Sequence, residues 1–407
     1  MRDCFQYIDT YLSQTQPFWR FEPFHDSGLA TAPWSSIAPE LEAWLSTLSN
    51  EQVAELKQQP EPLIAMLSVH IPKLDHIVQS LRLLLSNGQS NDFCEAYSEP
   101  YPGVPGRKFV QIKSLGAFLV SRHQGEAWLE WCSGKGYLGR WLASHSSHPV
   151  VSFEYQEALC EQGQLEADRL GLRMNFVQGD ALDVRSQRLF KAHQHAVALH
   201  ACGDLHVRLL QYAVTNQLAA ITFSPCCYHL IEGEYYSPLS QLAKRSALNL
   251  TRNELRIPLQ ETVTGGERVK RHRWLEMTYR LGWDELLKAE LGYQEYLPTP
   301  SVKKSQLNEG FEAFCCWAAA KKGMTLPTIH FEYYHQKGIE RFWKMERLSL
   351  VQHGFQRLLE LWLVLDRALF LQEQGYRVEI GEFCRRAITP RNLVIHAQKD
   401  NRVSPGY

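Results

Sequence analysis

Short apolar runs alternate with helical patterns through the middle of the chain. Runs of four or five aliphatic, β-branched and aromatic residues occur at 127–131, 150–153, 174–177, 196–199 and 219–223. Between them, apolar residues recur every three or four positions, which predicts helices near 138–144, 156–170 and 205–216. Residues 184–193 are expected to form a short helix or a loop. Strands that alternate with helices form right-handed βαβ units, so the pattern predicts a parallel sheet.

The pattern changes on both sides of this region. Residues up to about 95 have helical spacing, with a helix start at Pro39 and interruptions at Pro60 and Pro62. After 236 the alternation is lost, and residues 237–370 are expected to be mostly helical, with a turn at 264–266. Two strand patterns return at 376–380 and 392–397, and they predict a terminal hairpin.

These changes predict three parts, with a Pro/Gly/Tyr-rich stretch at 99–106 as the first boundary. We expect a helical N-terminal domain over 1–97, an α/β domain over 108–236 and 350–407, and a mainly helical insertion over 237–349. Dinucleotide-binding Rossmann sheets typically stay parallel. A closing hairpin instead indicates the Rossmann-like sheet of class I methyltransferases.

Composition excludes several classes of protein. The chain has 407 residues, 44% of them hydrophobic and 21% charged, which is typical of globular proteins. The formal net charge is -1, so binding to nucleic acid would need a local basic patch. The N-terminal residues lack the apolar core of a secretion signal, and the longest apolar run, 358–371, contains Glu360, Asp366 and Arg367. We therefore expect a cytoplasmic protein without a membrane span.

The ten cysteines do not form a recognisable metal or disulfide pattern. Without a secretion signal they are expected to be reduced thiols. The doublets Cys226-Cys227 and Cys315-Cys316 are adjacent residues rather than C-x2-C pairs. Because adjacent side chains are expected to diverge, no metal site is predicted.

A glycine-rich loop follows the first predicted strand. Gly134, Gly136 and Gly139 match the G-x-G-x-x-G fingerprint of dinucleotide sites, and Glu154 has about the spacing of a ribose-binding acid, so NAD is one candidate cofactor. However, acidic residues stand at or just beyond the ends of four strands: Glu130, Glu154, Asp180 and Asp204. Ligands of such sheets bind at this edge, where a pyrophosphate would be repelled by several kcal/mol. The sulfonium and ammonium of S-adenosylmethionine (SAM) would be attracted, so the sequence favours SAM.

Each acid has an expected role. Glu130 would attract the ammonium, Glu154 would accept both ribose hydroxyls, and Asp180 would accept a hydrogen bond from the adenine amine. The glycines would let the backbone approach the methionine part, near a helix N-terminus. The residues expected to bind the cofactor are Glu130, Cys132, Ser133, Gly134, Gly136, Tyr137, Glu154, Tyr155, Gly179, Asp180, Ala181 and His200.

Two polar segments follow the fourth and fifth strands, and they supply the catalytic candidates His200, Asp204, Cys226, Cys227, Tyr228 and His229. Either histidine would serve as a general base or as a packed core residue. Tyr228 would stack on a flat substrate or line a core. Cys202 and Cys226 would allow thiolate attack on a pyrimidine, although cysteine is also a common buried residue.

A dense basic run contains Arg268, Lys270, Arg271 and Arg273, followed by Trp274. It would bind RNA phosphates with a stacking surface beside them, or it is a solvated face of a helix or strand. The sequence leaves both interpretations open.

Four segments resemble a methyltransferase-like family: 130–138, 199–205, 224–229 and 389–393. The family includes ribosomal RNA adenine dimethylase domain-containing proteins and is more distantly similar to tRNA 2'-O-methyltransferases with a Cys-Cys-His segment. The resemblance covers about residues 108–235 and 370–400. It implies SAM binding through the glycine loop and Glu154, with 200–204 and 226–229 beside the substrate. Cys132 departs from the family, since many members have glycine there.

Together, these features predict a SAM-dependent methyltransferase that acts on RNA, with tRNA as a narrower candidate. The alternatives are a protein methyltransferase, a SAM-binding scaffold without catalysis, and an NAD-dependent oxidoreductase.

Overall fold

The computed structural model describes residues 1–86, 104, 106–260 and 266–400. The expected boundary at 99–106 and the expected turn at 264–266 lie largely outside these residues. The described chain divides into two compact units. One comprises residues 1–13, 77–259 and 358–407, and the other comprises 14–76 and 260–357.

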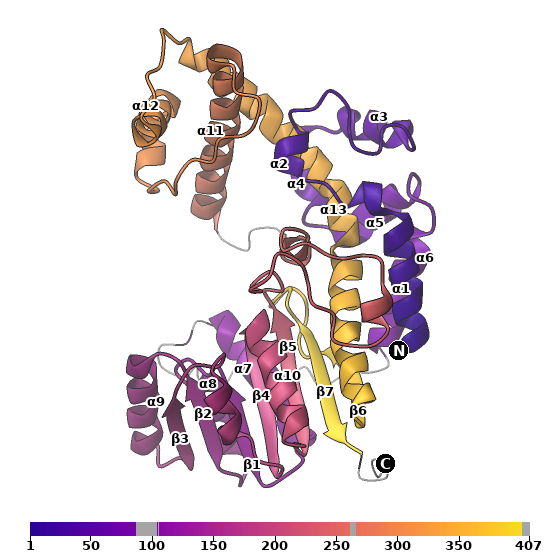
Figure 1. The fold of residues 1–407 in the computed structure, drawn as a ribbon, viewed down its shortest axis with the longest axis vertical. Helices are drawn as coiled ribbons and strands as arrows, with labels where there is room; N and C mark the ends of the chain where they lie inside the picture. The colour runs from indigo at the N-terminus through magenta and orange to yellow at the C-terminus, as the bar shows by residue number, and fades with distance from the viewer. Residues whose placement is uncertain (87–103, 105, 261–265, 401–407) are drawn as a thin grey trace. The chain divides into compact units, whose positions relative to one another are not determined.

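The first unit is built on a seven-stranded sheet with the order β3-β2-β1-β4-β5-β7-β6 (Figure 1). Strands β1 to β5 are parallel, and β7 runs antiparallel between β5 and β6. The predicted α/β class I methyltransferase sheet and its closing hairpin are confirmed. The strands are β1 (Ala127–Trp131), β2 (Val150–Glu154), β3 (Met174–Gln178), β4 (Gln194–Cys202), β5 (Ala220–Cys226), β6 (Tyr376–Glu382) and β7 (Leu393–Lys399).

One face of this sheet is covered by α7 (Gly106–Ser121), α8 (Tyr137–His145) and α9 (Glu157–Arg169). Alternation along β1 turns Trp128 toward this face, where it joins a core with Leu115 of α7 and Leu142 of α8. No helix was predicted at α7, because its buried face includes a glutamine and a glycine, which interrupt the apolar period. The predicted α8 and α9 are confirmed.

The opposite face packs against α10 (Asp204–Thr215), and hydrogen bonds link α10 to the start of the short helix η2 (Val184–Leu189) and to the C-terminal part of α13 (Phe331–Glu373). Trp131 of β1 stacks on Phe153 at a centroid distance of 4.7 Å. Arg367 of α13 donates from Nε to Nε2 of His206 in α10 at 2.7 Å. On α1 (Arg2–Gln14), Asp9 accepts from the indole of Trp362 at 2.8 Å. Buried polar bonds therefore fix α13 and α1 in this unit.

The second unit combines N-terminal helices with the segment expected to be an insertion. Glu346 of α13 forms salt bridges with Lys57 and with Arg273 of α11, so three segments distant in sequence meet at one carboxylate. Among the described residues, the helices that begin or lie in this unit are η1 (Gln16–Phe18), α2 (Pro23–Asp26), α3 (Pro39–Thr47), α4 (Asn50–Leu56), α5 (Pro60–Ser68), α6 (Leu74–Ser86), α11 (Glu267–Leu291), η5 (Gln306–Glu309), α12 (Phe311–Lys322) and the N-terminal part of α13.

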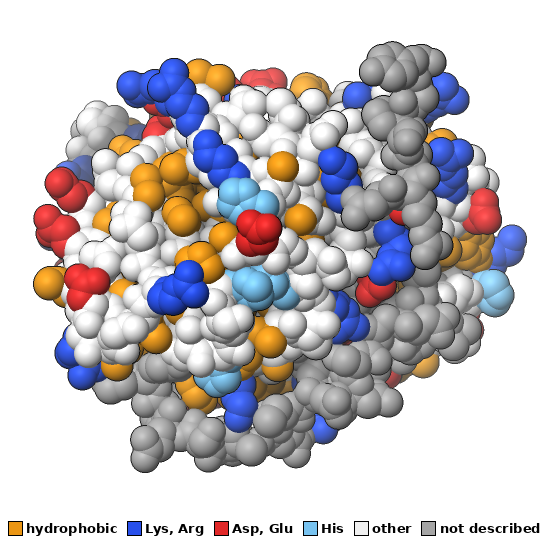
Figure 2. Space-filling model, turned by 90° about the horizontal axis from the view of Figure 1, so that it is seen from below, with side chains coloured by type: hydrophobic (Ala, Val, Ile, Leu, Met, Phe, Trp, Pro, Cys, Tyr) orange, Lys and Arg blue, Asp and Glu red, His pale blue; other side chains and the backbone are white. Residues whose placement is uncertain are grey.

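These units differ from the predicted three-part division. Residues 14–76 and 260–357 fold together, and the expected boundary at 349–350 lies inside the continuous helix α13. The apolar run 358–371 belongs to that helix, where Asp366 and Arg367 are buried. Among the described residues, no helix contains an apolar stretch long enough to cross a bilayer. Basic and acidic side chains are interspersed on the face shown in Figure 2, as the near-neutral net charge leads one to expect.

Candidate functional site

The glycine loop between β1 and α8 is built from left-handed backbone. Cys132, Gly134 and Gly136 have φ of 55°, 59° and 66°. A Cβ on Gly136 would lie 2.4 Å from the ring of Phe176 and 2.5 Å from Cε of Met174, so any larger residue would force these side chains to shift. At Cys132 a side chain adopts the same conformation, at a typical cost of about 1–2 kcal/mol. Cys132, which stands where many members of the resembling family have glycine, is therefore a strained position in the loop.

Glu154 fastens this loop to the end of β2. Its two carboxylate oxygens accept from the backbone N–H of Gly134 at 2.8 Å and of Gln156 at 3.0 Å. A carboxylate offers about four acceptor positions, so two remain for ribose hydroxyls. The predicted ribose role fits this geometry, and Glu154 has a second role in shaping the loop.

Glu130 lies within β1 and is 3% exposed, rather than open at the strand end as expected. It accepts from Ser152 Oγ at 2.6 Å and is also hydrogen-bonded by the backbone of Gly139 in α8. Burial raises its pKa to about 7, against the lowering effects of these bonds and of the cations Lys108 and Arg140. An ammonium group could therefore contact Glu130 directly only by entering the protein interior. Otherwise it would interact with Glu130 through a bridging water.

The adenine side of the predicted site is more open. Asp180 is exposed, and its Oδ1 accepts from the backbone N–H of Leu182 at 2.8 Å. A Cβ on Gly179 would lie 2.8 Å from Phe153, so the backbone passes close over that ring. Tyr155 is 66% exposed, whereas Ala181 is buried. Tyr137, at the start of α8, packs under the guanidinium of Arg140 at 4.5 Å.

Two local features fit a ligand at the glycine loop. The Oγ of Ser133 is buried and has no hydrogen-bond partner among the described residues. Beside it, a Cβ built on Gly134 would meet nothing within 4 Å in the described chain. An orphaned hydroxyl next to open space, one residue from the N–H that Glu154 binds, suits a polar and cationic cofactor better than a pyrophosphate.

His200 occupies a bulge in β4, where the register with β5 shifts between Leu199 and Ala201. Its Nε2 lies 2.9 Å from Oε1 of Gln111, so Nε2 carries the hydrogen and Nδ1 keeps a lone pair. That Nδ1 is buried without a partner among the described residues. Burial, followed by the charges of Lys108 and Arg391, lowers the pKa of His200 to about 3. His200 is thus neutral at pH 7 with a lone pair that can accept a hydrogen bond, but its low pKa makes it a weak base.

Two other candidates have structural partners instead. Tyr228 is 1% exposed, beside the guanidinium of Arg367 at 5.1 Å, so of its two interpretations the structure favours the core residue over a surface that stacks on substrate. Asp204 accepts from the backbone N–H of Glu232 at 2.9 Å, while its own N–H donates to Leu230. It fixes the loop after β5, and its catalytic role stays a prediction.

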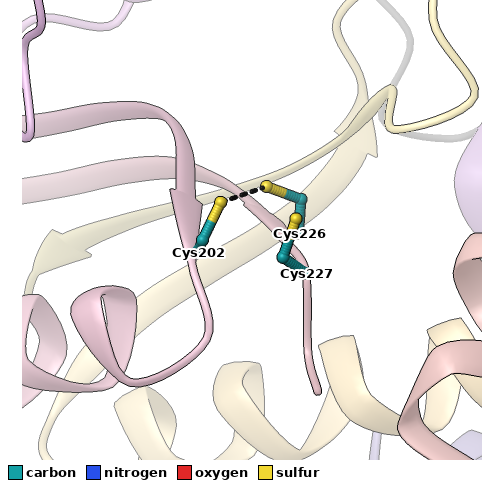
Figure 3. A group of neighbouring side chains, drawn as sticks. All are labelled: Cys202, Cys226 and Cys227. Atoms are coloured by element: carbon teal, nitrogen blue, oxygen red, sulfur yellow. Dashed lines mark hydrogen bonds between the residues drawn. The ribbon is translucent and has the colours of Figure 1, made fainter. Parts of the chain in front are cut away.

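Three cysteines meet where β4 and β5 end (Figure 3). The Sγ atoms of Cys202, Cys226 and Cys227 lie within 4.8 Å of one another, and those of Cys202 and Cys226 are 3.4 Å apart. The expectation that adjacent cysteines diverge is therefore wrong at this doublet. Cys226 is fully buried, and hydrogen bonds from Cys202 and Cys227 raise its pKa. Hydrogen bonds from Cys202 and Cys226, helped by Arg391, lower the pKa of Cys227. Cys227 is the thiol of the three best able to ionise.

His229 follows this group. Its Nδ1 is buried and lacks a partner among the described residues. Burial and then Arg256 lower its pKa below the usual 6.5, which leaves it neutral at pH 7.

Sequence reasoning missed three further residues at this edge. Lys108 and Gln111 come from α7, for which no motif or clear period gave a signal. Arg391 lies in the segment 389–393, whose only sequence signal is its family resemblance. Its charge lowers the pKa of His200, Cys227 and His229, so it lies near all three.

The basic run lies in the other unit, at the start of α11. Lys270 pairs with Glu267 at 2.9 Å, and Arg273 pairs with Glu346 at 3.0 Å. Arg268 and Arg271 are exposed and have no ion pair with any described residue. Trp274 packs beside Phe342 and Met345, so it is not a free stacking surface.

Residues 107–234 match a family model described as a methyltransferase domain. The strand order agrees with this match, and both support a class I methyltransferase fold for these residues, a fold that binds SAM. The chain is 27% identical over 145 residues to a mouse glutathione S-transferase C-terminal domain-containing protein, and 26% identical to the human one. Each match covers 34% of this chain and 22% of the relative, so the chain spans about a fifth of the length of these proteins.

Solved structures match more distantly. A Pyrococcus abyssi tRNA (uracil-54, C5)-methyltransferase in complex with S-adenosylhomocysteine is 20% identical, with a TM-score of 0.25 over 29% of each chain. A SAM-dependent methyltransferase from Aquifex aeolicus is 14% identical, with a TM-score of 0.23 over 28% of this chain and 62% of its own. At this level of likeness they carry no argument about function. The narrower family resemblance stays a prediction.

The close packing at Gly136 predicts that Gly136→Ala is more damaging than backbone strain alone. Gly171 has almost the same φ, 64°, but a Cβ there would meet nothing within 4 Å, so Gly171→Ala is a matched control. We expect the control to lose about 1–2 kcal/mol from left-handed strain, and Gly136→Ala to lose about 1–3 kcal/mol more from overpacking. Urea unfolding measures both, and equal losses would contradict the packing argument.

Proposed function

We propose that the protein transfers the methyl group of SAM to RNA. The observation that carries the methyl-transfer part is the glycine loop, held by Glu154 at 2.8 Å, with the orphaned hydroxyl of Ser133 beside open space. This loop lies at the carboxyl edge of a sheet with the class I strand order, where ligands of open α/β sheets bind.

The chain's own residues would bind and orient the reactants. Glu154 would accept the ribose hydroxyls, Asp180 would accept from the adenine amine, and Ser133 would gain the partner that it lacks. Bound SAM supplies a methyl group on a positively charged sulfur, and no metal or acid is needed to activate it. The remaining requirement is a nucleophile in line with that group, which is largely a matter of positioning.

His200 is the best-placed proton acceptor for the substrate. It is neutral, its Nδ1 lone pair is free of hydrogen bonds among the described residues, and its ring is held by Gln111 at 2.9 Å. A substrate N–H or O–H that loses its proton during methylation would pass it to Nδ1. Burial, with the charges of Lys108 and Arg391, disfavours the protonated ring, so His200 is a weak base and would relay the proton onward to water rather than hold it.

RNA is proposed over protein for two reasons. Arg268 and Arg271 are exposed cations without ion pairs among the described residues, as phosphate contacts require. In addition, Lys108 and Arg391 place positive charge beside His200, at the edge where the substrate would lie. A tRNA substrate is the narrower form of this proposal and rests on the family resemblance alone.

Cofactor choice is tested by thermal unfolding with SAM, S-adenosylhomocysteine or NAD, for wild type, Glu154→Gln and Glu157→Gln. A ligand at about 100 times its dissociation constant adds about 2.7 kcal/mol of stability. We expect SAM and S-adenosylhomocysteine to stabilise the wild type and the control Glu157→Gln, whose side chain is exposed on α9. Glu154→Gln should bind about tenfold to a hundredfold more weakly, through loss of charge-assisted hydrogen bonds. Stabilisation by NAD alone would contradict the proposal.

The substrate class is tested with methyl-labelled SAM and RNA or protein extracts from the source cells. We expect label that ribonuclease releases and protease does not. A plot of log affinity for RNA against log salt concentration has a negative slope. In the double variant Arg268→Ala/Arg271→Ala the magnitude of this slope should fall by about 1.4, because two phosphate contacts are lost. Lys303→Ala/Lys304→Ala removes two exposed cations from the same unit and should change the slope less. Protease-sensitive label would identify a protein substrate, and no transfer to either would favour a SAM-binding scaffold.

A further inference from the structure

The three-cysteine group depends on an irregularity in β4. Leu199 pairs with Ser224, but the next pair is Ala201 with Pro225, so His200 is an extra residue. The shift brings Cys202 opposite Cys226 at the carboxyl edge, where their sulfur atoms lie 3.4 Å apart. In a regular ladder without the extra residue, Cys202 would have paired with Cys227 instead of Cys226.

A second irregularity adds Cys227. Adjacent residues of an extended strand point to opposite faces. Cys227 instead has φ of 47°, a left-handed conformation, and its sulfur returns to the side of Cys226 and Cys202 (Figure 3). His200 is also left-handed, with φ of 65°. Two non-glycine residues thus adopt a costly backbone conformation, and both shape the three-thiol group.

We propose that Cys202, Cys226 and Cys227 form a binding site for Zn²⁺, with three thiolate ligands and an open fourth position. In a tetrahedral site with Zn–S bonds of about 2.3 Å, sulfur atoms lie about 3.8 Å apart. The observed sulfurs lie within 4.8 Å of one another, with one pair at 3.4 Å, so shifts of about 1 Å or less would suffice. The proposal does not depend on methyl transfer.

Burial and charge support a bound cation. Cys226 is fully buried at the base of the group, while Cys202 and Cys227 are half-buried, which leaves the ion a side from which to enter and to hold a fourth ligand. Three thiolates and Zn²⁺ have a net charge of -1. Arg391 beside Cys227 and Lys108 near Cys226 would offset that charge.

Binding would release the thiol protons of the three cysteines to solvent, since coordinated thiols are deprotonated outright. The rival explanation for such close sulfurs is a disulfide between Cys202 and Cys226, formed by a two-electron oxidant.

The experiment uses the full chain, purified without chelators or a histidine tag and kept reduced. Metal content is measured by mass spectrometry, and the metal-free protein is titrated with Zn²⁺ and with Cd²⁺, whose thiolate complexes absorb in the ultraviolet. We expect about one ion per chain and a Cd–thiolate band. Each single Cys→Ser change at the three positions should weaken binding at least about tenfold, and the triple change should abolish the band. Cys316→Ser, an exposed cysteine in the other unit, is the control and should bind as wild type does.

Three results would overturn the proposal: no thiolate band in the reduced protein, equal binding by the triple variant, or a Cys202–Cys226 disulfide that accounts for the missing thiols before reduction and no metal binding afterwards. Circular dichroism shows whether Cys227→Ser, a change at a half-buried position, still folds as the wild type does. A loss of metal binding by the folded variant is then a loss of the ligand and not of the fold. SAM stabilisation is measured on the same variants, so failure of the metal site and failure of the proposed methyl transfer are distinguishable.

Discussion

One buried carboxylate joins the elements that form the cofactor edge. Glu130 of β1 accepts from Ser152 of β2 at 2.6 Å and from the backbone of Gly139 in α8. Glu130 therefore links the strand before the glycine loop to the helix that follows the loop. Glu154 holds the middle of the loop at the N–H of Gly134. Because the loop is tied to two neighbouring strands, its left-handed residues keep one shape. Losing Glu130 would leave a buried hydroxyl and a buried N–H without an acceptor.

The same edge collects chemistry from segments far apart in sequence. The bulge at His200 and the left-handed turn at Cys227 bring the ends of β4 and β5 together. Arg391, from the loop before β7, adds charge to that group. The antiparallel insertion of β7 beside β5 is what places this loop there, so the feature that defines the sheet class also completes the site.

Local pattern predicted the strands well. All seven strand patterns lie within three residues of the observed bounds, because buried strands have short apolar runs and clear turns on both sides. The same reasoning failed for α7, whose buried face includes Gln111. It also could not join 14–76 to 260–357, since their contact depends on long-range ion pairs such as Lys57 with Glu346. At the site, the residue types were found but not their surroundings: Glu130 and Tyr228 are buried, and Cys227 turns back toward its neighbour.

The central claim is that the acidic edge selects a cationic cofactor, and proton release during binding tests it most directly. The pKa of Glu130 is about 7, so roughly half of the molecules have it protonated at that pH. A nearby ammonium would favour the ionised form. Calorimetric titration with S-adenosylhomocysteine at about pH 7, in buffers of different ionisation enthalpy, should therefore show release of up to about half a proton, reduced in Glu130→Gln. Binding without proton release, or release unchanged in Glu130→Gln, would contradict the account.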